Sequence, residues 1–338
     1  MASGKVARRT AVADVAELLD SPEVQALIAA LSPRGRGRKG FGPRTLVGAC
    51  LVKSLFALPT WTRVAALIAE HPGLQAAIGG APSCWACYRF TVKLRENQPA
   101  LADCLDAVTA ALQDAMPGIG EDVAIDASDL PAFANGQRYV RAGGPERERF
   151  SDPDASWGHR SAVSTRKGGG FYGYKLQLLV CTRTGLPLVW QAETARHHES
   201  KFVVPLLDAA HRRGFRPQTV AMDKGYDVER VHAECETRGV APVIPMRAFK
   251  IREQTVLRVG PITRHNPRIS RHSERFRGLY KGRAAVEREF GRLKHDYGLA
   301  PLRVRGLERV RLHADLVMLA RLALALRRAR ESALALAA

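Results

Sequence analysis

The sequence lacks the features of a membrane protein or a secreted protein. No run of 18 uninterrupted apolar residues occurs, because Lys53 and Arg321 interrupt the apolar stretches around them, so we expect no membrane-spanning helix. The N-terminal segment has no apolar core of the kind found in a secretory signal peptide. Only six cysteines are present in 338 residues, which is typical of a reduced, cytosolic protein.

A metal site built on cysteine is also not expected. The only CxxC motif runs from Cys84 to Cys87, and no second CxxC could complete a four-sulfur zinc site. Pro82 and Ser83 just before it are typical of a helix start. The two thiols would then share an apolar helix face, which favours core packing over chemistry.

Acidic residues are scarce relative to basic ones. The chain has 33 Asp and Glu against 52 Lys and Arg, a formal net charge of +19. A basic chain with 46% hydrophobic residues can fold around a core and most plausibly meets a polyanion such as nucleic acid. A general preference for arginine in the genome is the competing explanation.

The first 118 residues have an all-helical pattern. We expect helices over 11–31, over 44–79 with a break at Pro59, over 83–96 and over 98–115. The loop between the first two contains four basic residues that could bind phosphate or simply face solvent: Arg34, Arg36, Arg38 and Lys39. Short helices with basic loops suit a helix-turn-helix DNA reader, and a helical scaffold is the alternative.

The pattern changes after about residue 118. A strand within 121–130 is followed by a long polar loop, a hairpin over 171–195, and then alternating helices and strands up to a basic, irregular tract over 247–278. Two helices, over 280–297 and about 307–333, complete the chain. This order predicts an α/β domain with a mixed sheet flanked by helices.

Three acids occupy positions where a packed fold disfavours them. Asp126 lies within an apolar strand, Asp223 ends a second strand, and Glu287 lies in a basic helix. Acids converging from separate elements can share a divalent metal, which offsets their mutual repulsion. Singly, each has an ordinary explanation: a turn, a helix cap and an ion pair with Arg283.

The helix over 280–297 carries a polar stripe. Tyr280, Arg283, Glu287 and Lys294 are spaced by three, four and seven residues, which places them on one helical face. Next to them, the apolar side chains at 286, 290 and 293 form an edge that docks on the sheet. Glu289 falls on the opposite side, so we expect it to behave as a surface charge.

These residues resemble the DDE-type transposases of bacterial insertion sequences. Tyr280, Arg283, Glu287 and Lys294 match that family's Tyr-Arg-Glu-Lys signature, "DKGYD" (223–227) matches its second-aspartate motif, and "AIDAS" its first-aspartate strand. The resemblance starts near residue 40. It implies a helical DNA-binding domain over 1–118 and an RNase H-like catalytic domain over 119–338.

The resemblance also implies an activity. Asp126, Asp223 and Glu287 would bind two Mg²⁺ ions, with Mn²⁺ as a substitute, while Tyr280, Arg283 and Lys294 would position DNA. The enzyme would cut double-stranded DNA at terminal inverted repeats and join the freed 3′-OH to target DNA. We expect a dimer or larger oligomer on DNA, with no membrane partner, in the bacterial cytoplasm with the nucleoid.

One motif departs from the family. After the hairpin, "TARHHES" lacks the usual asparagine and has Glu199 where an aspartate is expected, so the roles of His197, His198 and Glu199 are open. Three other functions also remain: a nuclease of the same fold without strand transfer, a DNA-binding regulator derived from an inactive transposase, and a structural nucleoid protein.

Overall fold

The computed structural model describes residues 11–32, 40–160, 168–247, 249–251, 254–256 and 267–337. The chain divides into two compact units. One comprises Met1–Ala115, Leu293–Arg303 and Leu312–Ala338, and the other comprises Met116–Arg292 and Val304–Arg311. In the part of the chain that the structure describes, no helix is long and apolar enough to span a membrane.

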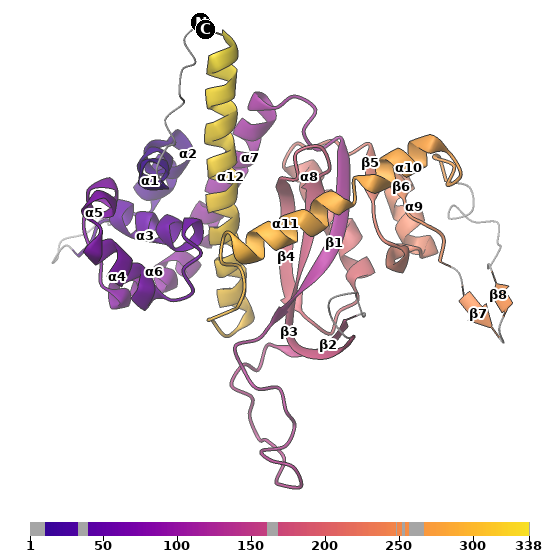
Figure 1. Cartoon of the computed structure of the whole chain (residues 1–338), viewed down its shortest axis with the longest axis horizontal. Helices are drawn as coiled ribbons and strands as arrows, with labels where there is room; N and C mark the ends of the chain where they lie inside the picture. The colour runs from indigo at the N-terminus through magenta and orange to yellow at the C-terminus, as the bar shows by residue number, and fades with distance from the viewer. Residues whose placement is uncertain are drawn as a thin grey trace, which may run out of the picture. The chain divides into compact units, whose positions relative to one another are not determined.

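The first unit is helical, as expected (Figure 1). Its helices are α1 (Ala11–Asp20), α2 (Pro22–Ala30), α3 (Pro43–Leu55), α4 (Trp61–Glu70), α5 (Pro72–Ile78), α6 (Cys84–Glu96), α7 (Gln98–Ala115) and most of α12 (Leu307–Ala337). The single helix expected over 11–31 is wrong. Ser21 has extended backbone angles and Pro22 starts a new helix, because proline cannot continue the hydrogen bonding of the helix before it.

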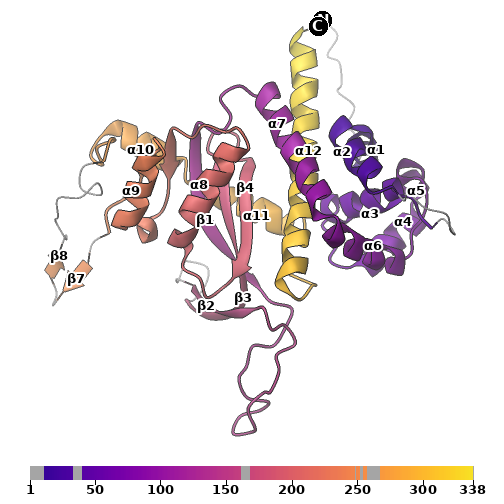
Figure 2. The ribbon, with the colours of Figure 1, turned by 180° about the vertical axis from the view of Figure 1, so that it is seen from behind.

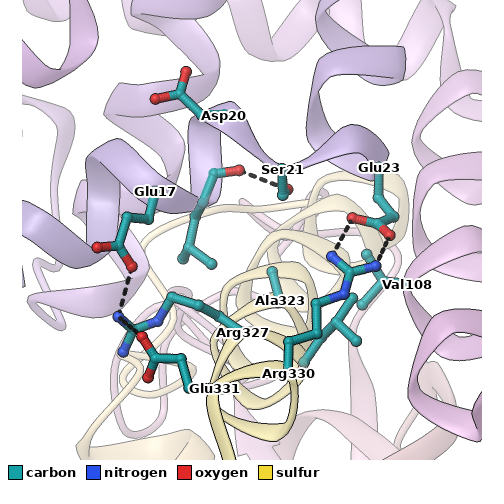
Figure 3. A pocket seen from close by; sticks show the side chains of 11 residues that line it. Glu17, Asp20, Ser21, Glu23, Val108, Ala323, Arg327, Arg330 and Glu331 are labelled. Carbon is teal, nitrogen blue, oxygen red and sulfur yellow. Dashed lines mark hydrogen bonds and ion pairs between the residues drawn. The ribbon is translucent and has the colours of Figure 1, made fainter. Parts of the chain in front are cut away.

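Helix α12 supplies a large part of this unit's core. Leu316 and Leu326 are buried, which confirms the prediction that this helix packs internally. Arg330 forms two hydrogen bonds with the buried carboxylate of Glu23, at 2.6 and 3.3 Å, and Arg327 binds Glu17 at 2.8 Å (Figure 3). These pairs line a pocket of about 330 Å³ between α1, α2, α7 and α12.

The second unit is built on a mixed sheet. Its strands are β1 (Asp122–Pro131), β2 (Ser156–Arg160), β3 (Gly169–Cys181), β4 (Pro187–Thr194), β5 (Thr219–Ala221) and β6 (Ala241–Val243). The order across the sheet is β4-β3-β1-β5-β6, with β2 paired to the start of β3. Strands β3 and β4 form the expected antiparallel hairpin, and β5 and β6 run parallel to β1. A separate hairpin joins β7 (Phe249–Ile251) and β8 (Gln254–Val256).

Helices cover both faces of this sheet. They are α8 (Val203–Arg212), α9 (Glu229–Thr237), α10 (Glu274–Lys281) and α11 (Ala284–His295), with short 3₁₀ turns η1 (Glu199–Phe202) and η2 (Lys224–Tyr226). Helix α11 crosses in front of the sheet in Figure 1 and behind it in Figure 2, whereas α8 lies on the other face. This mixed sheet with helices on both faces confirms the RNase H-like architecture.

The helix expected over 280–297 is interrupted, which corrects the sequence prediction. Helix α10 ends at Lys281 and α11 begins at Ala284. The amides of residues 282, 283, 285 and 286 all bond to the carbonyl three residues earlier, so the chain tightens into a 3₁₀-type turn. Gly282 lies so close to Thr182 that an added Cβ would be 3.0 Å from its side chain.

Candidate active site

The first two acids lie at equivalent positions on neighbouring parallel strands. Strands β1 and β5 pair up to Ala124 and Ala221. Asp126 and Asp223 each follow two residues later. The register of a parallel pair therefore brings both carboxylates to the same end of the sheet. Ligands of one metal site, which the sequence predicts them to be, must lie close together in this way.

Asp126 is a largely buried acid whose pKa is raised. One carboxylate oxygen accepts a hydrogen bond from the amide of Ala127 at 2.8 Å, and 19% of the side chain is exposed. Burial raises the pKa of Asp126 to about 7, and the nearby charges of Asp223 and Glu199 add to the rise against the lowering effect of Arg283. The raised pKa of this carboxyl group therefore comes mainly from its burial.

Asp223 is held by the turn that follows it. Its side chain accepts a hydrogen bond from the amide of Gly225 at 2.6 Å and so caps the 3₁₀ turn η2. An added Cβ at Gly225 would be 2.9 Å from the Asp223 carboxylate, so glycine there leaves room for the acid. Only one carboxylate oxygen is used in this cap, and the other can bind a ligand.

Arg283 links the first acid to the third. Its guanidinium lies 3.3 Å from Asp126 and 2.6 Å from Glu287, and 5.9 Å from the ring of Tyr280. Burial lowers the pKa of Arg283, but the hydrogen bond and charge of Glu287, together with the charge of Asp126, raise it, and the net pKa lies above its ordinary value. Arg283 therefore contacts Asp126 directly, and Tyr280 and Glu287 contact Arg283, although the helix that carries them is broken.

The donor set suits a divalent cation that prefers oxygen ligands. Carboxylates are the protein ligands that Mg²⁺ and Mn²⁺ favour, and Asp126 and Asp223 bring two of them to the same end of the sheet. Among the described residues, no three acidic, histidine or cysteine side chains converge as metal ligands. Arg283 lies between Asp126 and Glu287 instead, so a shared ion would require this arginine to turn aside.

Two other acids lie on or after the same strands, and each has a partner of its own. Asp129 on β1 pairs with Arg160 at 3.2 Å. Asp227, 2% exposed, contacts His232 at 3.0 Å and accepts a hydrogen bond from the amide of Arg247 at 2.7 Å. Both carboxylates are engaged in structural contacts.

A family model describing a transposase DDE domain matches residues 118–323. The chain belongs to the DDE transposase family. A search of curated proteins gives no match to the chain. Membership confirms the resemblance and identifies a transposase of the insertion-sequence type, an enzyme that carries out phosphoryl transfer on nucleic acid, with DNA as its partner. The family as a whole depends on divalent metal ions.

The other DNA-contacting residues predicted from the sequence are Lys294 and the basic residues of the N-terminal loop. Lys294 follows Glu287 by seven residues on α11 and so lies on the same face of that helix. The basic residues at 34, 36, 38 and 39 lie outside the described residues, as does much of the basic tract over 247–278.

The expectation for Glu289 is wrong. Its side chain is 0% exposed and pairs with Arg292. Val286, Phe290 and Leu293 are buried as predicted, and Glu289 lies three residues after Val286 and four before Leu293. Residues at these spacings share a helical face. The buried face of α11 therefore includes Glu289 as well as the three apolar residues.

Sequence reasoning missed two neighbours of the transposase acids. Lys175 on β3, 8% exposed, pairs with Glu199 at 2.6 Å. Tyr226, within "DKGYD", is 1% exposed. The motif position of Glu199 was the one signal available, whereas Lys175 and Tyr226 look like an ordinary strand residue and a core aromatic.

Proposed function

We propose that this transposase cleaves DNA at the ends of its element and transfers the freed 3′-OH to target DNA, using Asp126, Asp223 and Glu287 to bind two Mg²⁺ ions. The observation that supports this most strongly is the linkage of Asp126 and Glu287, 161 positions apart, through Arg283. Asp223 is close enough to Asp126 to raise its pKa.

The protein's own side chains would orient the DNA. Bound Mg²⁺ or Mn²⁺ would supply Lewis-acid activation of water and of the scissile phosphate. Once Arg283 is released from its carboxylates, its guanidinium can bind a phosphate through two parallel hydrogen bonds, and the ammonium of Lys294 can add a single positive charge. Tyr280, stacked on Phe276 with ring centroids 6.0 Å apart, would present its hydroxyl from a fixed ring.

We also propose that the helical region over about 1–118 binds the terminal repeat. Helix α6 supports this, because its exposed stripe holds Trp85, Tyr88 and Val92, which are 69%, 45% and 43% exposed, with the exposed Arg89 among them. Ser83 caps the helix through the amide of Ala86 at 3.2 Å. A rigid helix that presents aromatic and arginine side chains suits base and phosphate contacts in a groove.

The activity is tested with labelled duplex DNA carrying the inverted repeats that flank the gene. The proposal predicts Mg²⁺-dependent nicking at the repeat end, followed by joined products with a second duplex. Nicking without joining would favour a nuclease of the same fold, and DNA binding without either product would favour an inactive descendant. Because two ends must be joined, we expect a dimer or larger assembly on paired ends.

The role of α6 is tested in the full chain, because the helical unit includes the C-terminal helix. Arg89→Ala should weaken binding to the repeat and lower the slope of log affinity against log salt by about one. Arg63→Ala, at an exposed position on α4, is the control of equal charge. Equal losses in the two variants would show that only net charge matters and would remove α6 from the interface.

A further inference from the structure

The segment between β1 and β2, residues 132–155, forms an arm of the second unit. It extends beyond the end of the sheet in both views (Figures 1 and 2). Strand β1 ends at Pro131, five residues after Asp126. At about 3.3 Å per strand residue, the base of the arm therefore lies roughly 17 Å from Asp126, so the arm continues the strand that carries the first acid.

The outer part of the arm, residues 138–147, is a short antiparallel ribbon. Tyr139 and Glu146 form a β-bridge across it, and the amide of Arg147 donates to the carbonyl of Arg138 at 2.8 Å. The guanidinium of Arg138 also pairs with the carboxylate of Glu146 at 2.7 Å. Backbone and side-chain contacts thus join the two sides of the ribbon.

The base of the arm is anchored. The indole N–H of Trp157 donates to the carbonyl of Gly136 at 2.9 Å, and Arg305 Nε donates to the carbonyl of Phe133 at 2.7 Å. Gly136 packs so closely that an added Cβ would be 2.2 Å from the ring of Tyr172. A ribbon on an anchored base loses less conformational entropy when it binds a partner than a free loop does.

The surface of the ribbon suits DNA better than protein. Tyr139 and Val140 are 49% and 54% exposed, and Arg141 and Arg149 are exposed and make no ion pair with the described residues. Residues 138–149 contain four arginines and two glutamates. A protein interface buries about 800 Å² on each partner around a centre poor in charge, which a small basic tip does not offer. A two-stranded ribbon does fit the major groove of DNA.

We infer that this ribbon binds duplex DNA at least about five base pairs from the phosphate that is cut. Roughly 17 Å from Asp126 corresponds to about five base pairs at ~3.4 Å each. Arg141 would bind a backbone phosphate, and Tyr139 would lie in the groove. This inference rests on the proposed function, which brings the cut phosphate to the carboxylates, and adds a DNA contact outside the catalytic site.

The test measures binding of the full-length protein to repeat-end duplexes in EDTA. Arg141→Ala should weaken binding about three- to tenfold and lower the slope of log affinity against log salt by about one. Arg212→Ala, at an exposed position on α8, is the control of equal charge and should leave both values unchanged. The duplex is then shortened towards the cut from one end or the other. When it no longer reaches the ribbon, Arg141→Ala and the wild type should bind equally.

Equal losses for Arg141→Ala and Arg212→Ala, or a loss that is the same at every duplex length, would overturn the inference. Val140→Ser should leave the sedimentation of the DNA-free protein unchanged, and a shift would assign the ribbon to a second copy of the chain instead. If the wild type cuts no repeat-end DNA in Mg²⁺, the proposed function fails. Cleavage by the wild type together with unchanged DNA binding by Arg141→Ala refutes only the role of the ribbon.

Discussion

Asp126→Asn should stabilise the metal-free protein at alkaline pH while abolishing cleavage. Burial raises the pKa of Asp126 from 3.8 to about 7 in the folded protein, so the fold prefers the protonated acid. Its ionised form therefore costs stability in full above pH 7, and the cost falls away as the pH drops towards 3.8. At about 1.4 kcal/mol per pKa unit the cost has an upper limit of ~4 kcal/mol.

The gain from asparagine is smaller than this limit. The substitution also removes the contact between Asp126 and Arg283 at 3.3 Å, and a buried amide still requires partners. We expect the free energy of unfolding to rise by about 1–3 kcal/mol at pH 8 and by progressively less towards pH 4. The assay is urea unfolding in EDTA at several pH values.

The control is Asp129→Asn on the same strand. It breaks the pair with Arg160 at 3.2 Å and should lower stability by up to about 1 kcal/mol. The reasoning is refuted if Asp126→Asn is less stable than the wild type at pH 8. It is also refuted if the difference in unfolding free energy between Asp126→Asn and the wild type is the same at every pH.

Two further predictions concern α11 and the turn before it. Glu289→Gln should lower the free energy of unfolding by about 1–3 kcal/mol, because Arg292 loses its buried partner, and a value near zero in urea unfolding would contradict the buried pair. Gly282→Ala should cost about 1–3 kcal/mol through its approach to Thr182. Gly291→Ala is the control, because nothing lies within 4 Å of its added Cβ, and it should stabilise the helix by about 0.5–1 kcal/mol. Similar changes in the melting temperature of the two alanine variants would show that Gly282 and Thr182 are not tightly packed.

The sequence was sufficient to predict the helical region, the hairpin, the mixed sheet and the neighbouring positions of Asp126 and Asp223. Those predictions depend on local periodicity and on strand ends, which the sequence carries directly. Of the signature residues, Arg283 contacts Asp126 directly, whereas Tyr280 and Glu287 contact Arg283; the uninterrupted helix predicted through them was wrong. The 3₁₀ turn at Gly282 lies against Thr182, in a distant segment, and against the carbonyl oxygen of Leu279, neither of which the helical periodicity predicts.

Three other features depended on tertiary contacts in the same way. The burial of Glu289 follows from how widely α11 docks on the sheet, which a helical wheel does not specify. Strand β2 forms within the predicted loop because it pairs with the start of β3. The pairing of Lys175 with Glu199 joins residues 24 positions apart, and neither residue type alone distinguishes it from a surface ion pair.

The central claim is that Glu287 is the third carboxylate of the active site. The most direct test compares Mg²⁺-dependent cleavage of repeat-end DNA by Glu287→Gln and by Glu274→Gln, a nearby acid on α10 whose side chain is 95% exposed. Loss of a metal ligand should reduce cleavage by Glu287→Gln about a hundredfold or more, while Glu274→Gln keeps wild-type activity and both variants bind DNA. Equal cleavage by the two variants would contradict the account.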